Sequence, residues 1–121
     1  MIKTITFFII LFYSLESFSF KGDFSVVFQY KNKLNFSEKI TLERSNKSIK
    51  LNGIILPSEK IIVHKSTISY LVLNKLKSTS RFGCAAGGYV YEIKKEGKNS
   101  KEEGCLESDR FKKLIKLFKS I

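Results

Sequence analysis

Residues 108–121 read SDRFKKLIKLFKSI, and this carboxy-terminal stretch carries the clearest secondary-structure pattern of the chain. Its apolar side chains recur at helical spacing, at Phe111, Leu114, Ile115, Leu117, Phe118 and Ile121. Ser108 and Asp109 stand directly before them and suit the amino terminus of a helix, where side-chain oxygens accept hydrogen bonds from unpaired backbone amides. The remaining positions hold a set of lysines, namely Lys112, Lys113, Lys116 and Lys119. The pattern predicts an amphipathic helix that is apolar on one side and positively charged on the other.

The apolar side of that helix needs a sheet to cover, and alternating patterns upstream predict one. Large apolar residues alternate with other side chains in three stretches, at Phe24, Val26, Phe28 and Tyr30, then at Ile40 and Leu42, then at Ile49 and Leu51. Asn52-Gly53 readily adopts the positive φ angles of a tight hairpin turn, so we expect Ile54–Leu56 to pair with Ile49–Leu51. Ile61–Val63 is a further candidate strand.

Two more strands and one ambiguous segment complete the expected fold. Tyr89, Tyr91 and Ile93 form one face of a strand, and after a turn the chain returns as Lys101–Cys105. Ser66–Lys77 fits both a helical stripe and an alternating strand, and possible caps at its amino end with lysines at its carboxyl end favour a helix. The fold class is therefore α+β, a small antiparallel sheet covered by the carboxy-terminal amphipathic helix.

The chain contains two cysteines, Cys84 and Cys105, which allow one intramolecular disulfide. The expected hairpin leaves Cys105 near its base, where Cys84 can meet it. A bridge that closes a loop of about twenty residues stabilises a fold by roughly 3 kcal/mol in the chain-entropy account. We predict a structural disulfide, and a reactive thiol pair is the alternative.

Residues 1–19 have the layout of an export signal. Lys3 precedes the apolar run Ile5–Leu15, Glu16 ends the run, and the small residue Ser19 offers a cleavage site. A membrane-spanning helix would need about 20 consecutive apolar residues, so a membrane anchor is the weaker interpretation. We therefore expect an exported protein, periplasmic or secreted, with no transmembrane anchor in its mature chain.

Residues 20–121 contain no repeat, linker or low-complexity tract, and we expect them to form a single small α+β domain. Removing residues 1–19 takes away Lys3 and Glu16, one charge of each sign, so the net charge of +11 is unchanged. Such a charge on a small domain favours an acidic protein or an anionic surface as partner. The alternative is a lysine-rich surface that is simply solvated.

Few residues suit catalysis. His64 is the only histidine, and it lies beside the apolar Ile61–Val63 with no partner group at a recognisable spacing. A zinc site needs at least three good ligands, which one histidine and two bridged cysteines do not supply. The acidic residues near the last hairpin are interpreted as a solvated edge and a helix start, and they are Glu102, Glu103, Glu107 and Asp109. We predict no catalytic, cofactor-binding or metal site.

Tyr89 and Tyr91 are spaced like the paired aromatic residues on which single-stranded nucleic acid stacks. Export argues against nucleic acid as a partner. The candidate binding surface combines these tyrosines with the lysines of the last helix, as Tyr89, Tyr91, Lys112, Lys113, Lys116 and Lys119. The leading functional hypothesis is a non-catalytic inhibitor-like or immunity-like module for a protein partner. The alternatives are a cationic protein that acts on anionic membranes or envelope polymers and, third, a hydrolase that uses His64 or an acidic pair.

Overall fold

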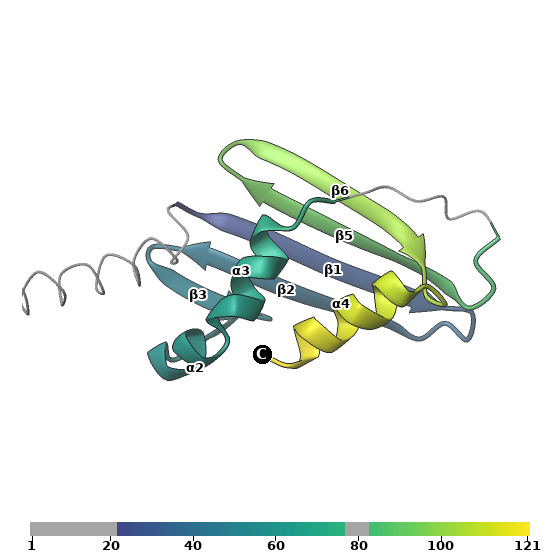
Figure 1. Ribbon diagram of the computed structural model, residues 1–121, viewed down its shortest axis with the longest axis horizontal. Helices are drawn as coiled ribbons and strands as arrows, with labels where there is room; N and C mark the ends of the chain where they lie inside the picture. Colours follow the sequence, from purple (N-terminus) through teal and green to yellow (C-terminus); the bar gives the residue numbers. More distant parts are fainter. Residues whose placement is uncertain (1–21, 77–82) are drawn as a thin grey trace, which may run out of the picture.

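The computed structural model describes residues 22–76 and 83–121, which form a six-stranded antiparallel sheet with helices packed on one face (Figure 1). The elements are β1 (Phe24–Asn32), β2 (Ser37–Ser45), β3 (Ser48–Leu51), β4 (Ile54–Ile55), α2 (Ser58–Val63), α3 (Lys65–Leu73), β5 (Gly87–Lys95), β6 (Lys98–Cys105) and α4 (Asp109–Lys119). The strand order is β4-β3-β2-β1-β5-β6. The predicted α+β class is confirmed. The predicted export signal and its cleavage site lie outside the described residues.

β1 lies at the centre of the sheet because it pairs with both β2 and β5. Its Phe28 lies opposite Ile40 on one side and Tyr91 on the other. The alternation along each strand sends these large side chains to the face that carries α3 and α4, where they are buried. The other face carries polar residues of the same strands, such as Ser25 and Gln29. The core therefore lies between the sheet and the two helices.

Two tight turns fix the hairpins at opposite edges of the sheet. Asn52 and Gly53 have φ angles of 53° and 81°, the positive values that a two-residue hairpin turn needs, so the predicted pairing of β3 with β4 is confirmed. Glu96 and Gly97 have φ angles of 51° and 73° and join β5 to β6 in the same way. Because this turn has only two residues, β6 begins earlier than the predicted Lys101–Cys105.

The helical prediction for Ser66–Lys77 is confirmed in type, but α3 begins at Lys65 and ends at Leu73. Lys75 therefore lies beyond the helix, and Lys77 lies outside the described residues. The prediction of a strand at Ile61–Val63 is wrong, because these residues form the end of α2. A short apolar run fits a buried strand and a helix equally well, and only neighbouring structure decides between them.

α4 and the disulfide are confirmed. The Ser108 side chain accepts a hydrogen bond from the Phe111 backbone amide at 3.1 Å, which caps the helix as the sequence predicts. Phe118 stacks on Phe28 with ring centroids 4.7 Å apart, so the apolar side of α4 covers the centre of the sheet. Cys84 and Cys105 form the disulfide. Within residues 22–76 and 83–121, none of the helices has the length and apolar character that crossing a membrane requires.

Candidate binding surface on the carboxy-terminal helix

The structure separates the predicted binding residues into two groups. Tyr89 and Tyr91 are 1% and 0% exposed, because the alternation of β5 turns both rings toward the helices. Tyr89 packs against Phe28 and Phe111, with ring centroids 5.8 and 5.6 Å away. The Tyr91 hydroxyl donates a hydrogen bond to the Leu71 backbone carbonyl. Placing these two tyrosines on a binding surface was wrong, since both belong to the core.

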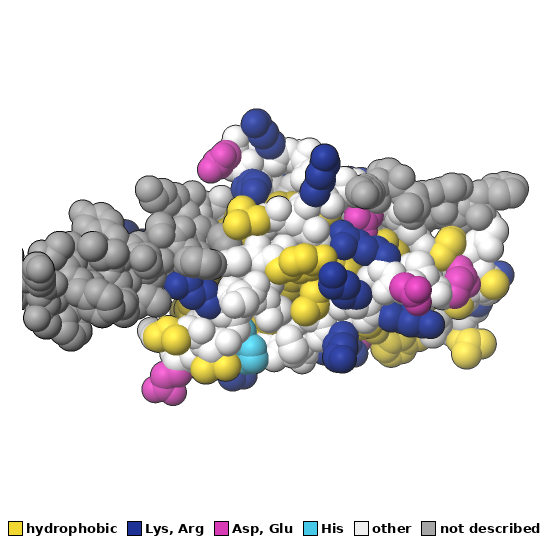
Figure 2. All heavy atoms as spheres, in the orientation of Figure 1, with side chains coloured by type: hydrophobic (Ala, Val, Ile, Leu, Met, Phe, Trp, Pro, Cys, Tyr) yellow, Lys and Arg dark blue, Asp and Glu magenta, His cyan; other side chains and the backbone are white. Residues whose placement is uncertain are grey.

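The lysines of α4 do lie on the surface. Lys112, Lys113, Lys116 and Lys119 are all exposed, and we call them the lysine face. In Figure 2 dark-blue side chains gather over α4. Five basic residues and one acidic residue, Asp109, lie in the helix, which gives it a net charge of +4. The Lys119 ammonium contacts a Glu38 carboxylate oxygen at 3.3 Å. The lysine face therefore presents concentrated positive charge on a helix whose other side is buried.

A buried ion pair holds this helix on the sheet. Glu102 of β6 is 1% exposed, and Arg110 in the first turn of α4 binds its carboxylate with two parallel hydrogen bonds, Nε to Oε2 at 3.0 Å and Nη2 to Oε1 at 3.1 Å. The interpretation of Glu102 as part of a solvated edge was therefore wrong. The reason is the strand register, which places Glu102 beside Tyr91 on the helix side of the sheet. Such two-point pairing fixes geometry as well as charge.

Gly104 explains how the Tyr89 ring fits beside this pair. A Cβ atom at Gly104 would lie 2.6 Å from Cε1 of the Tyr89 ring, so the ring occupies the space that a side chain would fill. From there the Tyr89 hydroxyl donates a hydrogen bond to Oε2 of Glu102 at 2.8 Å. Burial raises the pKa of Tyr89, and the neighbouring Glu102 carboxylate raises it further. Tyr89 is therefore a donor that keeps its proton in the folded protein.

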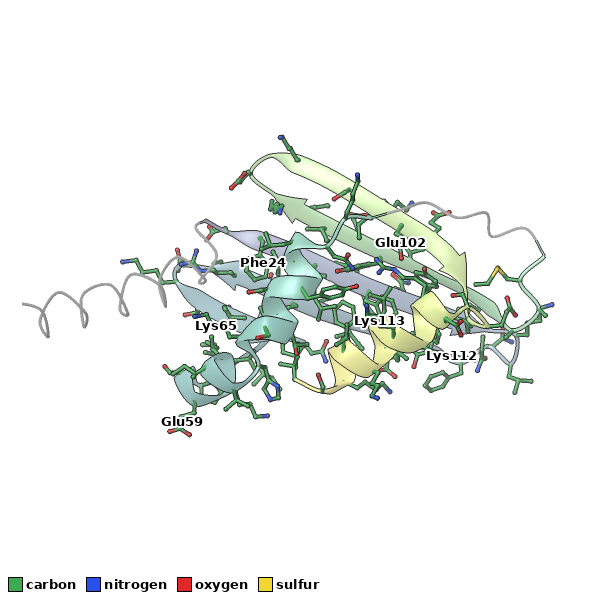
Figure 3. All side chains as sticks on the ribbon, in the orientation of Figure 1. Phe24, Glu59, Lys65, Glu102, Lys112 and Lys113 are labelled. Carbon is green, nitrogen blue, oxygen red and sulfur yellow. A yellow bond between two sulfur atoms is a disulfide. The ribbon has the colours of Figure 1, made fainter. Side chains whose placement is uncertain are left out.

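Tyr70 of α3 connects the ion pair to the surface. Arg110 Nη1 donates to the Tyr70 hydroxyl at 3.2 Å, and the Lys113 ammonium lies 4.9 Å from the centroid of the Tyr70 ring. Burial alone would raise the pKa of Tyr70, but hydrogen bonding and charge from Lys113 and Arg110 outweigh burial and lower it. Figure 3 shows Lys112 and Lys113 on α4 and Glu102 on the sheet. Tyr70 also lines a shallow groove on α3 with Ser66, Ser69, Leu73, Asn74 and Lys75.

The groups considered for catalysis have structural contacts. His64 joins α2 to α3, with its backbone amide bonded to the Lys60 carbonyl at 2.9 Å and its carbonyl bonded to the Ile68 amide at 2.9 Å. Glu107 accepts a hydrogen bond from the Ala86 amide at 2.8 Å. The carboxylate of Glu107 also lies near both cysteine sulfurs, but these sulfurs are bonded to each other and are not metal ligands.

Sequence reasoning missed Arg110, Glu102 and Tyr70 as a connected group. Alternation along β6 could have placed Glu102 and Gly104 on one face of the sheet, because they lie two residues apart, but it does not say whether that face is buried. No spacing rule could have brought Tyr70 to Arg110, which is forty residues away along the chain.

Comparison with known proteins finds no family model, no curated protein and no solved structure that matches this chain.

Proposed function

We propose that this protein is an exported, non-catalytic binding module that holds an acidic protein partner against the lysine face of α4. The observation that carries this assignment is the exposure of Lys112, Lys113, Lys116 and Lys119 on a helix fixed to the sheet along its other side. An inhibitor-like or immunity-like role fits such a module, because blocking a partner needs a rigid surface and no chemistry of its own.

Charge and rigidity support binding in different ways. A net charge of +11 attracts an acidic partner over a distance and speeds encounter. The Glu102–Arg110 pair and the burial of Leu114 hold α4 in place before the partner arrives. A surface that is already ordered loses less conformational entropy when it binds. The lysine side chains themselves still have to be ordered, which makes the backbone position of α4 the main contribution of the fold.

The disulfide and the amino-terminal sequence support export. Disulfides persist in oxidising compartments and are rare in the cytosol. Cys84 and Cys105 are bonded in the described fold, and the run Ile5–Leu15 has the composition of an export signal.

Membrane insertion of α4 is less well supported than protein binding. A surface-bound amphipathic helix places its apolar side in the lipid. Here that side is occupied, since Leu114 and Phe118 are buried against the sheet. Insertion of α4 would therefore require the helix to leave the core.

Charge reversal tests the lysine face directly. Poly-L-glutamate serves as a probe for an acidic protein surface, and binding to residues 20–121 is measured by titration at low and high salt. The triple variant Lys112→Glu, Lys113→Glu, Lys116→Glu should lose binding by at least about a hundredfold, since it removes three attractive charges and adds three repulsive ones. Binding by the unchanged protein should weaken at high salt because of screening.

A matched control separates the lysine face from net charge. The triple variant Lys31→Glu, Lys39→Glu, Lys94→Glu makes the same change in net charge on exposed strand positions. It should retain most of the binding. Equal loss in the two triple variants would show that poly-L-glutamate responds to the overall charge, and the assignment to α4 would then be abandoned.

A further inference from the structure

α2 differs from the other helices because it buries none of its residues. Its last two side chains, Ile62 and Val63, are 66% and 76% exposed, and the two residues of β4, Ile54 and Ile55, are 72% and 61% exposed. We call these four aliphatic residues the β4–α2 patch. A run of large exposed apolar side chains rimmed by polar residues marks an interaction surface more often than a scattered single residue does.

The backbone holds the patch in a defined position. Ile54 pairs with Leu51 and lies on the helix side of the sheet, whereas Ile55 pairs with Lys50 and lies on the opposite side. The patch therefore wraps the edge of the sheet. Leu56 follows directly, is buried, and donates its amide to the Ile49 carbonyl at 2.8 Å. Figure 2 shows yellow side chains beside the single histidine at this end of the molecule.

The sequence around the patch residues is rich in lysine. Residues 47–65 contain four lysines, Lys47, Lys50, Lys60 and Lys65, against one acidic residue, Glu59, which gives the segment a net charge of +3 with His64 neutral. In Figure 3 the labelled Glu59 lies at the outer end of α2, and Lys65 lies where α3 begins. Lys50 pairs with Ile55 in the sheet, and Lys60 lies in α2 with Ile62 and Val63, so basic residues lie beside the aliphatic ones.

A second copy of the chain is a poor occupant for this patch. Pairing two copies would bring two bodies of charge +11 together with their basic segments facing each other. Stable protein interfaces also bury about 800 Å² on each side, which four aliphatic side chains do not supply. An anionic bilayer surface matches both features, because its headgroups attract lysines and its acyl region accepts aliphatic side chains.

We propose that the β4–α2 patch docks this protein reversibly on a lipid surface with anionic headgroups. Ile54, Ile55, Ile62 and Val63 enter the boundary between headgroups and acyl chains, and Lys50 and Lys60 contact the headgroups. α4 stays on the sheet throughout. This membrane contact is separate from the lysine face, which remains for the acidic protein partner.

Vesicle sedimentation tests the docking. Residues 20–121 are mixed with phosphatidylcholine vesicles that contain about a quarter phosphatidylglycerol, and with pure phosphatidylcholine vesicles. Anionic vesicles should bind the protein at low salt, pure phosphatidylcholine should bind it far more weakly, and high salt should reduce binding because charge contacts are screened. The variant Ile62→Ser, Val63→Ser should lower partitioning by at least about tenfold, since two aliphatic side chains no longer leave water.

The matched control is Leu34→Ser, Phe36→Ser, which removes two exposed apolar side chains from the turn between β1 and β2. It should change partitioning by less than about twofold. Thermal unfolding of each variant checks that the fold is intact. Equal loss in the two double variants would overturn the assignment of docking to the β4–α2 patch.

Two further outcomes would also overturn it. Equal binding to both vesicle types would remove the role of anionic headgroups. A dimer in sedimentation equilibrium that Ile62→Ser, Val63→Ser dissociates, without vesicle binding by the unchanged protein, would assign the patch to a second copy. The two triple charge-reversal variants should weaken vesicle binding to a similar extent, whereas only the α4 variant should lose binding to poly-L-glutamate. This difference keeps the membrane contact distinguishable from the lysine face.

Discussion

The helices α2 and α4 both contain large apolar side chains, but the fold buries those of α4 and exposes those of α2. α4 buries Leu114 and Phe118 against the centre of the sheet and exposes its lysines. α2 buries none of its residues and exposes Ile62 and Val63. An apolar side on a helix therefore does not by itself show that this side is buried in the core. The apolar side is buried only where a sheet face lies opposite the helix. β4 has only two residues and therefore provides little sheet surface for α2 to cover.

The two helices also differ in how they are held. α4 has a side-chain cap at Ser108, the Arg110 contact to Glu102, and a disulfide at Cys105, four residues before the helix begins at Asp109. The amino end of α2, at Pro57, has no side-chain cap hydrogen bond, and at its carboxyl end the His64 backbone amide donates to the Lys60 carbonyl. Several kinds of interaction thus hold α4 in place, whereas few hold α2. Substitutions in the two helices should therefore have very different effects on the stability of the protein.

The largest loss of stability is expected from a substitution on the buried side of α4. Leu114→Ala should lower the free energy of unfolding by about 2–5 kcal/mol, because it removes buried contacts and leaves a cavity. Urea unfolding measures the change, with the slope of the transition checked for constancy. Ile115→Ala, at a half-buried position on the same helix, should cost clearly less. A fully stable Leu114→Ala protein would show that α4 is not part of the core in solution.

The next largest loss of stability is expected from removing the disulfide. Cys84→Ser should lower the free energy of unfolding by about 2–4 kcal/mol, because the unfolded chain regains the freedom that the bridge removes. Cys105 also leads into α4, since Ser108 donates its hydroxyl hydrogen bond to the Cys105 carbonyl at 2.7 Å. The reduced wild-type protein is the control and should unfold at the same urea concentration. A thiol assay that detects two cysteines in the native, unreduced protein would contradict the bridge.

The ion pair beneath α4 should have a smaller effect. Glu102→Gln keeps the shape of the side chain but removes its charge, and loss of charge-assisted hydrogen bonds costs about 1.5–3 kcal/mol. The control is Glu103→Gln, the next residue, which faces the other side of the sheet and pairs with Lys101 at 3.1 Å. Because that pair is partly solvated, its loss should cost at most about 1 kcal/mol. Similar costs at both positions would show that the burial of Glu102 does not matter.

These differences also explain what sequence reasoning could and could not predict. Alternation predicted the faces of β1, β2 and β5, and Asn52-Gly53 predicted its hairpin, because both signals are local. The same alternation placed Tyr89 and Tyr91 together, but it does not say which face is solvated, so they were assigned to the wrong one. Arg110 and Tyr70 meet only through the packing of α3 beside α4, and no local pattern encodes that contact.

The tyrosines give a pH-dependent measure of how α4 is held. Tyr70 has a lowered pKa, so its phenol should ionise below the ordinary value of about 10. Tyr89 and Tyr91 have raised pKa values, mainly through burial. Their stabilising contribution is fully present below pH 10 and is lost as pH rises toward their folded pKa values. Tyr70 contributes in the opposite direction, because its lowered pKa adds stability as pH rises through it.

Ultraviolet titration of residues 20–121 should therefore show one early phenol, and later ionisation accompanied by unfolding. Tyr70→Phe should remove the early step and leave the later one. Lys113→Gln should move the early step to higher pH, because it removes one of the two cations that lower the pKa of Tyr70. An early step that survives Tyr70→Phe would show that Arg110 and Lys113 do not act on this phenol as described.

The smallest expected effect on stability belongs to α2, and it completes the contrast with α4. Ile62→Ser should change the free energy of unfolding by no more than about 0.5 kcal/mol, because the side chain is already in water and its replacement has a similar helix propensity. Urea unfolding under the conditions used for Leu114→Ala measures both changes on one scale. The comparison fails if Ile62→Ser destabilises the protein as much as Leu114→Ala, since that result would place α2 in the core. A stable Ile62→Ser protein with lost vesicle binding would instead show that the apolar residues of α2 serve a contact outside the fold.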